Sequence, residues 1–483
     1  MPEFFSFISE ILWGSLMLYL LLAAGIWLAF RSKFIPFRLI GDFYQNLKSR
    51  SSAQSGGLTS SQALLLSLAG RMGTGNLAGV ALAITTGGPG AIFWMWVCAL
   101  FSMATCFAES TLAQLYKERD DNQQFRGGPA WYMSRGLGMR WMGVLFSLFL
   151  LLTYGLLFNT IQANSVVWAV KYAWGIPEIY TGIFLAGTLL LLITKGLRDI
   201  ARFMQRVVPV VAFAWVAVSI GIGIDNITRL PQVIFEIIQG AFGWQEAASG
   251  AMGYTLSQAL TSGFQRSMYS NEVGLGSTPN AAAAAASSPP HPAAQGFVQM
   301  AGVVVDTFMV CSASAFILLL SNVAPTDNAV RGIQLMQEAM VTLTGEWGAS
   351  FVALIIFMFA FSSIATNYVY AENNLIFLKK NSARNRWILR AGVVLMVLTG
   401  SQLRLPLLWH LTDVLMAFMA ITNLTAILLL SPVVNIIAGD YLRQRKLGVT
   451  PVFNASRYPE INRQLAPGSW DSPARTPVSN RNY

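Results

Sequence analysis

The chain has 483 residues, of which 54% are hydrophobic and only 11% are charged. A soluble domain carries about 25% charged residues, so this composition excludes an ordinary soluble protein and indicates that lipid is the main solvent. The net charge of +10 lies mostly in short loops between apolar runs, which is typical of membrane-topology signals and disfavours a nucleic-acid-binding protein.

Apolar stretches long enough to cross a bilayer, about 20 residues each, recur along the whole chain. They predict an all-α polytopic membrane protein with about eleven transmembrane helices. The predicted spans lie near residues 9–30, 62–87, 90–115, 141–170, 178–195, 200–224, 247–270, 296–321, 347–376, 386–401 and 406–437. The first has its basic residues after the apolar run, which is typical of a retained span and not of a cleaved signal peptide. We therefore expect one transmembrane domain over residues 1–440.

The distribution of basic residues predicts the orientation of these spans. With the N-terminus outside, 27 of the 32 Lys and Arg fall in inside segments, four fall in outside segments, and Arg71 falls within a span. Cytoplasmic loops carry an excess of Lys and Arg, and one missed span would invert every later loop. The pattern therefore favours eleven spans with a cytoplasmic C-terminus. Residues 441–483 are polar and contain several prolines, and we expect a loosely ordered cytoplasmic tail there.

The second predicted span is interrupted near its middle by small and polar residues. It runs from Ser67 to Gly79 as SLAGRMGTGNLAG, with Gly73, Gly75 and Asn76 at its centre. Glycine weakens a helix interior, and unpaired backbone groups in hydrocarbon are tolerated only where they line a cavity or a ligand. Free N–H groups at such a break attract a carboxylate, and free carbonyls suit Na+. The alternative is close helix packing through the GxxxG pair Gly75–Gly79.

Polar side chains also form stripes on the fourth and ninth spans. Asn159, Gln162 and Ser165 follow one face of the fourth, and Gln162 is suited to donate to a substrate carboxylate. The ninth carries Ser362, Ser363, Thr366 and Asn367, whose hydroxyl oxygens are hard ligands suited to Na+. The alternatives are interhelical hydrogen bonds for Gln162 and bonding of Ser or Thr to the preceding helical turn.

Few acids lie within the predicted spans. Asp306 is the deepest, and it is either a proton carrier or the partner of a base such as Arg71; the sequence leaves both open. Glu109 and Glu372 lie near inner ends, which favours structural roles. The inner segment from Arg266 to His291 combines a Gly- and Pro-containing turn with an Ala run that favours a short helix.

The sequence disfavours an enzyme. It contains no GxxxxGK[ST] loop, no HExxH pattern and no Ser/His/Asp set. The three cysteines are isolated in apolar stretches and the two histidines are far apart, so we expect neither a cofactor nor a metal site beyond a coupling ion. Without a nucleotide-binding loop, an ion gradient is the expected energy source.

Three blocks of the chain resemble the alanine/glycine:cation symporter family, the bacterial sodium:alanine carriers. The first is Gly73–Val80 leading into Gly87–Trp96, the second is Gln124–Met133, and the third is Ser270–Ser277. The resemblance covers about nine tenths of the chain, and the three blocks together are highly specific.

This resemblance implies a LeuT-type fold, with spans 2–6 and 7–11 as two inverted five-helix repeats after one extra N-terminal helix. It implies Na+-coupled symport of alanine, with glycine and serine as further substrates, by alternating access across a bacterial cytoplasmic (inner) membrane. The residues implied to line the amino-acid site are Gly73, Thr74, Gly75, Asn76, Gln162, Trp168, Ser363 and Asn367. Those implied to hold Na+ are carbonyls near Ala69 and Met72 and the hydroxyls of Ser362 and Ser363.

Two positions depart from the family pattern. Many members carry Gly-Trp where this chain has Thr366-Asn367, and the loss of an indole widens and polarises the pocket. Arg71 lies beside the implied ion site, where its charge opposes Na+ unless it is turned away or paired. A proton-coupled transporter of the same fold is therefore the main alternative, while a channel and a membrane-embedded enzyme are disfavoured because neither filter motifs nor catalytic motifs are present.

Overall fold

The computed structural model describes residues 8, 11–32, 34, 38, 41, 43, 46, 57–244, 252–323, 332–402, 406–467 and 470. Parts of several predictions lie outside these residues. They are the start of the first span at residues 9–10, the start of the seventh at 247–251, tail residues 468–469 and 471–483, and the basic residues Lys33, Lys48, Arg50, Arg331, Arg404, Arg475 and Arg481.

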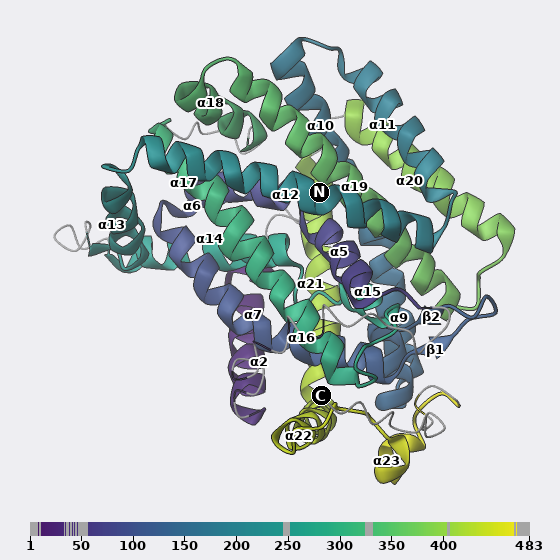
Figure 1. The fold of residues 1–483 in the computed structure, drawn as a ribbon. Coiled ribbons are helices and arrows are strands. Elements are labelled where there is room, and N and C mark those ends of the chain that lie inside the picture. The colour runs from purple at the N-terminus through teal and green to yellow at the C-terminus, as the bar shows by residue number, and fades with distance from the viewer. Residues whose placement is uncertain are drawn as a thin grey trace, which may run out of the picture.

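The described chain is mostly helical (Figure 1), and helices occupy the region of every predicted span. In the first half these are η1 (Leu12–Leu16) with α2 (Met17–Arg31), α5 (Ser60–Arg71), η2 (Gly75–Gly79) with α6 (Val80–Gly87), α7 (Gly90–Leu115), α9 (Arg140–Leu152) with η4 (Thr153–Leu157) and α10 (Phe158–Trp174), α11 (Glu178–Ile193) and α12 (Leu197–Asp225). In the second half they are α14 (Met252–Asn271), α15 (Pro279–Ala283), α16 (Pro292–Val303) with η6 (Val304–Cys311) and α17 (Ser312–Ser321), α19 (Trp347–Phe377), α20 (Ala383–Gln402) and α21 (Pro406–Leu429).

Within the part of the chain that the structure describes, seven helical runs are long and apolar enough to cross a membrane. They are Leu12–Arg31, Gly90–Leu115, Arg140–Trp174, Leu197–Asp225, Pro292–Ser321, Trp347–Phe377 and His410–Leu429. Two shorter apolar helices are Gly75–Gly87 and Glu178–Ile193. α14 and α20 fall outside this set because α14 is rich in Gly, Ser, Thr and Gln and α20 begins with basic residues. Length and composition thus confirm a multi-pass membrane protein.

The helices α13 (Leu230–Ala241) and α18 (Gly332–Thr344) were not predicted from the sequence. They lie at the left and upper-left margin of the molecule in Figure 1. Both are shorter than the ~20 residues that a bilayer crossing needs, so hydropathy over a membrane-length window does not detect them.

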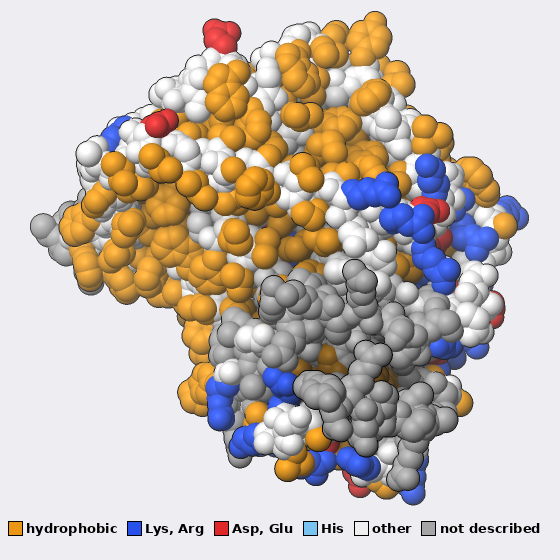
Figure 2. Space-filling model, in the orientation of Figure 1, with side chains coloured by type: hydrophobic (Ala, Val, Ile, Leu, Met, Phe, Trp, Pro, Cys, Tyr) orange, Lys and Arg blue, Asp and Glu red, His pale blue; other side chains and the backbone are white. Residues whose placement is uncertain are grey.

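The surface separates into apolar and basic regions (Figure 2). Hydrophobic side chains cover much of the upper and left parts of this face, whereas Lys and Arg gather at the right and along the bottom. Helix α12 alone exposes Val210, Phe213 and Ile220. Apolar surface of this extent is rare on soluble monomers and is suited to contact with lipid.

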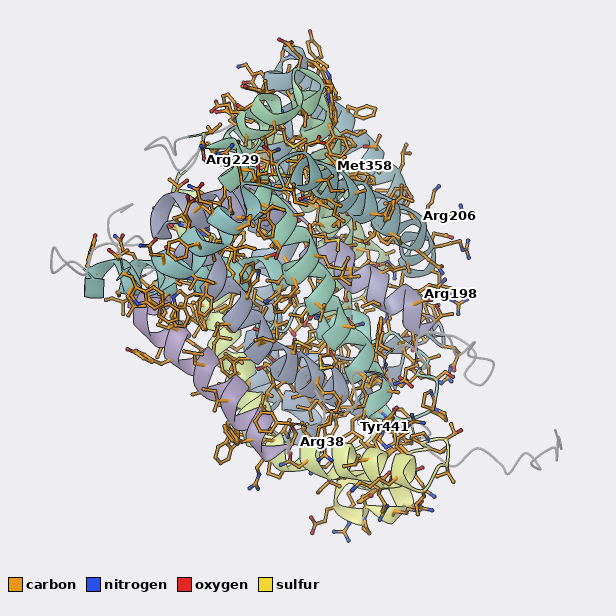
Figure 3. All side chains as sticks on the ribbon, turned by 60° about the vertical axis from the view of Figure 1, so that its left-hand side comes forward. Arg38, Arg198, Arg206, Arg229, Met358 and Tyr441 are labelled. Carbon is orange, nitrogen blue, oxygen red and sulfur yellow. The ribbon has the colours of Figure 1, made fainter. Side chains whose placement is uncertain are left out.

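Basic residues assigned to opposite sides of the membrane also lie apart in the structure (Figure 3). Arg38 lies in the lower part of that view and Arg198 and Arg206 at the right, while Arg229 lies at the upper left. The sequence assigns Arg38 and Arg198 to inside segments and Arg229 to an outside segment.

The interior is organised around two long helices. α7 packs against α14 and α16, and α19 packs against α10, α5 and α12. α5 touches α16 as well as α19 and so lies between the two groups, as Figure 1 shows near the centre of the molecule.

A short β-hairpin lies near the lower right of Figure 1. A two-stranded antiparallel hairpin pairs β1 (Glu118–Arg119) with β2 (Phe125–Arg126). It is followed by α8 (Pro129–Trp131) and η3 (Tyr132–Gly136).

The expectation of a loosely ordered tail is wrong for residues 441–467. α22 (Ser431–Lys446), η8 (Ala455–Arg457) and α23 (Pro459–Asn462) continue the fold at the bottom of Figure 1. Phe453 is buried, and its N–H donates to the Pro290 carbonyl at 3.0 Å. Trp470 is buried as well, and its Nε1 donates to the Leu115 carbonyl at 3.0 Å. Apolar anchors spaced through a polar segment therefore hold it against the helices.

Candidate functional site

The second predicted span is a broken helix. A capping box between Thr59 and Gln62 begins α5, and α5 ends at Arg71 because Met72 is extended, with φ −77° and ψ 96°. A π-helical turn, η2, then begins at Gly75. The predicted interruption is confirmed, and the structure locates it at Met72–Thr74.

Side chains take over the backbone hydrogen bonds at this break. The N–H of Gly73 donates to Asn76 Oδ1 at 3.1 Å. The N–H of Thr74 donates to Gln162 Oε1, on α10, at 3.0 Å. Two backbone donors therefore depend on amide side chains at a point where a ligand carboxylate could replace those acceptors.

Ser363 connects the break to α19. Its hydroxyl accepts a hydrogen bond from Gln162 Nε2 at 3.1 Å and donates to the Gly70 carbonyl at 3.1 Å. All of these groups are buried. The structure thus brings together the predicted residues Thr74, Gln162 and Ser363 in one hydrogen-bonded group. The contact between Gly73 and Asn76 lies directly beside it.

The glycines of the first break have different roles. A Cβ on Gly73 would lie 2.5 Å from Gln162 Nε2, so this glycine gives Gln162 access to the backbone. A Cβ on Gly75 would lie 3.1 Å from the Ser270 Cα, so Gly75 allows close helix packing. A Cβ on Gly79 would meet nothing nearer than 3.8 Å. The packing alternative, a GxxxG pair of Gly75 and Gly79, therefore holds for Gly75 but not for Gly79, and it does not explain Gly73.

A second break follows α14, in the segment predicted to be an inner loop. Glu272, Gly274 and Gly276 have φ of +55°, +83° and +83°, and the short helix α15 confirms the expected helical Ala run. Residues 267–287 are buried. Because Gly75 and Ser270 are in contact, the two breaks meet inside the protein.

Buried polar groups support the second break. Glu109 on α7 accepts from the Gly274 N–H at 3.3 Å and from Asn423 Nδ2 at 3.2 Å. Asn423 also donates to the Gly274 carbonyl at 2.9 Å and accepts from the Tyr132 hydroxyl. These contacts agree with a structural role for Glu109.

Several buried polar atoms near the two breaks have no hydrogen-bond partner among the described residues. They are Thr74 Oγ1, Asn367 Oδ1 and Tyr370 OH. The rings of Tyr154 and Tyr370 are 6.3 Å apart, and a Cβ on Gly70 would lie 2.9 Å from Tyr370 OH. Unsatisfied buried polar groups are rare and costly, and a polar ligand bound between these elements would supply their missing partners.

The other predicted site residues are more loosely connected to this group. Asn367 donates to Asn159 Oδ1 at 3.0 Å, which ties α19 to α10. Ser362 donates to the Phe359 carbonyl at 2.9 Å, the within-helix alternative considered for serine. Trp168 lies about 9 Å along α10 from Gln162, where the Lys171 ammonium is 5.1 Å from its ring centroid. Ala69 and Met72 are buried on either side of Gly70–Arg71.

Arg71 is turned toward α7 and α16. Its guanidinium donates to the Gln299 carbonyl at 3.2 Å and to Cys106 Sγ at 3.3 Å, whereas Ser363 reaches α5 from α19. None of the ion pairs among the described residues joins Arg71 to Asp306. Asp306 instead accepts from Asn76 Nδ2 at 2.6 Å. Asp306 and Arg71 therefore do not form an ion pair, and the alternative that they pair is wrong.

Ser270, Glu272, Tyr154 and Tyr370 also belong to this region, although they were not predicted as site residues from the sequence. Ser270 and Glu272 lie in the third block that carries the family resemblance, so a signal existed for them. Tyr154 and Tyr370 lie within long apolar runs, where a single tyrosine carries no pattern.

Comparison with known proteins finds one family and several relatives that this chain resembles. The sequence profile of a family described as the sodium:alanine symporter family matches residues 1–455. An uncharacterized transporter of Escherichia coli, YaaJ, is 61% identical over 471 residues, with 98% of this chain and 99% of the relative covered. The probable sodium/glutamine symporter GlnT of Bacillus subtilis is 42% identical, with 92% and 91% covered. The amino-acid carrier protein AlsT of the same organism is also 42% identical, with 94% and 95% covered.

Proposed function

This chain belongs to the sodium:alanine symporter family, and from that membership we propose that it imports a small neutral amino acid together with Na+. Alanine is the proposed main substrate, with glycine and serine as further ones. The single observation that carries the proposal is the broken helix at Met72–Thr74, whose N–H groups bond to the side chains of Asn76 and Gln162.

The amino-acid carboxylate binds at this break. Gly73, Thr74, Gly75 and Asn76 present backbone N–H groups at the start of η2, where the helix dipole favours an anion. Gln162 assists, because its Nε2 donates to Ser363 and can turn to a carboxylate oxygen. A small substrate fits a site bounded by Trp168 and Asn367, and the name of the GlnT relative makes glutamine a further candidate to test.

Na+ binds where the end of α5 faces α19. The carbonyls near Ala69 and Met72 and the hydroxyls of Ser362 and Ser363 supply hard oxygen ligands. The contact between Ser363 Oγ and the Gly70 carbonyl, at 3.1 Å, supports this position because it brings both types of ligand together. Arg71 directs its charge toward Gln299 and Cys106, which lessens its opposition to Na+.

The architecture proposed is a LeuT-type inverted repeat with eleven crossings. One broken helix lies in each proposed repeat, at α5–α6 and at α14–α15, and discontinuous helices in corresponding positions are typical of such transporters. Alternating access then occurs by movement of one bundle against the other around the two breaks.

We place the protein in a bacterial cytoplasmic membrane with the N-terminus outside. Residues 1–440 form the transporter and residues 441–483 a cytoplasmic segment. The separation of Arg38 and Arg198 from Arg229 (Figure 3) supports this orientation, because basic residues concentrate on the cytoplasmic side.

Uptake of labelled alanine by proteoliposomes tests the proposal. An inward Na+ gradient should drive accumulation, and an equal K+ gradient should not. A competition panel of the twenty amino acids, glutamine included, then identifies the substrate. The proposal fails if Na+ stimulates uptake of no small neutral amino acid.

A proton-coupled transporter of the same fold is the second candidate. The buried carboxylate of Asp306 beside Asn76 favours it, because intramembrane acids serve as proton relays in transporters. Uptake driven by a pH gradient without Na+ would identify this alternative.

A further inference from the structure

A groove on the outer surface of the helices separates α9 and η4 from α20. Its volume is about 560 Å³, which lies within the range of ligand-binding pockets, about 300–1,000 Å³. Its walls are mostly leucine and isoleucine side chains, among them Leu152, Ile388 and Leu395, which are exposed. Because the helices cross a membrane, an apolar molecule can enter this groove from the lipid.

The length of the groove matches one half of a bilayer. One wall follows α20 from Asn385 to Met396, which at 1.5 Å per residue is about 16 Å. The hydrocarbon core of a bilayer is about 30 Å thick. Gly392 deepens the groove, because a Cβ there would lie 3.1 Å from Leu156 Cδ2. These dimensions suit the acyl chain of a lipid from one leaflet.

The polar side chains of the groove lie together at the end where α20 begins. They are Lys380, which is exposed, and Asn385. Asn385 Nδ2 donates to the Lys380 carbonyl at 2.8 Å, and the Lys380 N–H donates to the Leu375 carbonyl at 3.1 Å. Trp387, two positions further along α20, is exposed, and exposed indoles are typical of the level of the lipid headgroups. The polar end of the groove therefore fits a headgroup.

The charge around this end is positive. Residues 378–402 contain five Lys and Arg and neither Asp nor Glu. None of the ion pairs within the described part of the chain involves these five residues. A second apolar hollow, of about 340 Å³ beside Trp174 and Phe184, has no charged residue in its lining. The groove at α20 thus combines an apolar channel with a basic end, and clusters of basic residues at a membrane surface attract anionic lipids.

We propose that this groove binds one anionic phospholipid, with an acyl chain between α9 and α20 and its phosphate at Lys380 and Asn385. The Lys380 ammonium donates to the phosphate. The amide of Asn385 has two N–H donors, of which one holds the Lys380 carbonyl and the other is available to the phosphate. A zwitterionic phospholipid carries the same phosphate, but its ammonium group would meet the basic residues around it. The proposal does not depend on the transported substrate or the coupling ion.

Photo-cross-linking of a lipid to the purified full-length protein tests this site. The protein is placed in phosphatidylcholine liposomes that contain a trace of phosphatidylglycerol with a photoreactive acyl chain, and the labelled peptides are mapped. Label should appear in residues 388–396 of α20. Unlabelled phosphatidylglycerol should displace it roughly fivefold more effectively than added phosphatidylcholine. Label at the hollow beside Trp174 and Phe184 should be displaced equally by the two lipids.

Two variants separate the headgroup contact from the acyl-chain contact. Lys380→Gln should reduce the label in the groove roughly fivefold, because it removes one charge from an exposed position. Gly392→Leu should reduce it as well, because the new side chain fills the groove beside Leu156. Lys446→Gln is the matched control. It removes an exposed lysine from α22, at the bottom of Figure 1 and away from α20, and should leave the label unchanged.

Three results would overturn the inference. They are equal displacement of the groove label by the two lipids, an unchanged label in both Lys380→Gln and Gly392→Leu, and cross-links from the groove to a second copy of the chain in place of lipid. Displacement by glycerol phosphate alone would also overturn it, because the site would then take a free phosphate and not a lipid. Absence of Na+-stimulated uptake would refute the proposed function and leave this lipid assay unaffected, so the two failures are distinguishable.

Discussion

Gln162 Oε1 accepts a hydrogen bond from the backbone N–H of Thr74 at 3.0 Å, at the break that separates α5 from η2. The acceptor is a side chain of another helix, 88 positions along the chain. This contact stands in place of a helical hydrogen bond, and it lies at the centre of the proposed site.

Substitution of Gly73 by alanine should abolish most transport. The new Cβ would lie 2.5 Å from Gln162 Nε2 and 2.9 Å from its Oε1, so Gln162 must leave the break. We expect kcat/KM for Na+-driven alanine uptake to fall roughly tenfold or more. Gly79→Ala is the matched control, because its Cβ meets nothing nearer than 3.8 Å. Equal losses in both variants would contradict this role for Gly73.

Gln162→Ala should weaken substrate binding without unfolding the protein. It leaves the Thr74 N–H without its acceptor and removes the contact with Ser363. An unsatisfied buried donor costs about 1–3 kcal/mol, so half-saturating alanine should rise roughly tenfold. Gln232→Ala, which removes an exposed glutamine bonded to Glu236 on α13, should have no effect. An unchanged alanine dependence in Gln162→Ala would remove this residue from the site.

Ser363→Ala should act mainly on the sodium dependence. The hydroxyl contacts the Gly70 carbonyl, and its loss removes one proposed ligand. We expect half-saturating Na+ to rise roughly tenfold, measured as alanine uptake against Na+ concentration. The control is Ser401→Ala, which removes a buried hydroxyl bonded to the Leu398 carbonyl within α20. A change in alanine affinity alone, with the sodium curve intact, would argue against the ion site.

The contact between His291 and the C-terminal segment should make stability depend on pH. His291 Nε2 lies 3.3 Å from Asp440 Oδ2, and its ring packs on Tyr441 and Phe453. Burial lowers the pKa of His291, and the Asp440 carboxylate offsets only part of this effect. Burial by itself would raise the pKa of Asp440. Its hydrogen bonds, first among them the one with His291, outweigh burial and hold the pKa of Asp440 below its usual value.

The direction of this pH dependence follows from the pH at which His291 takes up a proton in the unfolded and in the folded chain. The unfolded chain protonates its histidine near pH 6.5, whereas the folded protein keeps His291 neutral to a lower pH. Stability is therefore full above about pH 6.5 and falls as the pH drops below it; the contribution of Asp440 is lost only in stronger acid. The thermal midpoint in detergent should fall between about pH 7 and pH 5, and His291→Gln should flatten that fall. His410→Gln should not flatten it, and identical slopes in the two variants would refute this assignment.

The sequence predicted the first break well but not its partners. Gly73, Gly75 and Asn76 interrupt an apolar helix at bilayer depth, and that local conflict is visible without a structure. The contact of Asn76 with Asp306 joins residues 230 positions apart, and single-sequence patterns carry no information about such pairs. The choice between a proton carrier and an ion pair for Asp306 therefore stayed open.

The second break was harder to predict than the first. α14 is only weakly apolar, and a buried segment with Glu272 at φ +55° has the composition of a loop. The C-terminal segment was misjudged for a related reason. Its proline and polar residues are typical of a tail, while the burial of Phe453 and Trp470 depends on surfaces that only the folded helices provide.

The most direct test of the central claim is an electron cryomicroscopy map of the protein in lipid nanodiscs, with and without alanine and Na+. The account predicts a broken helix at Met72–Thr74 in both maps, and in the first an added density against the N–H groups of Gly73 and Thr74 beside Gln162. A continuous helix through these residues, or alanine bound at another place, would contradict it.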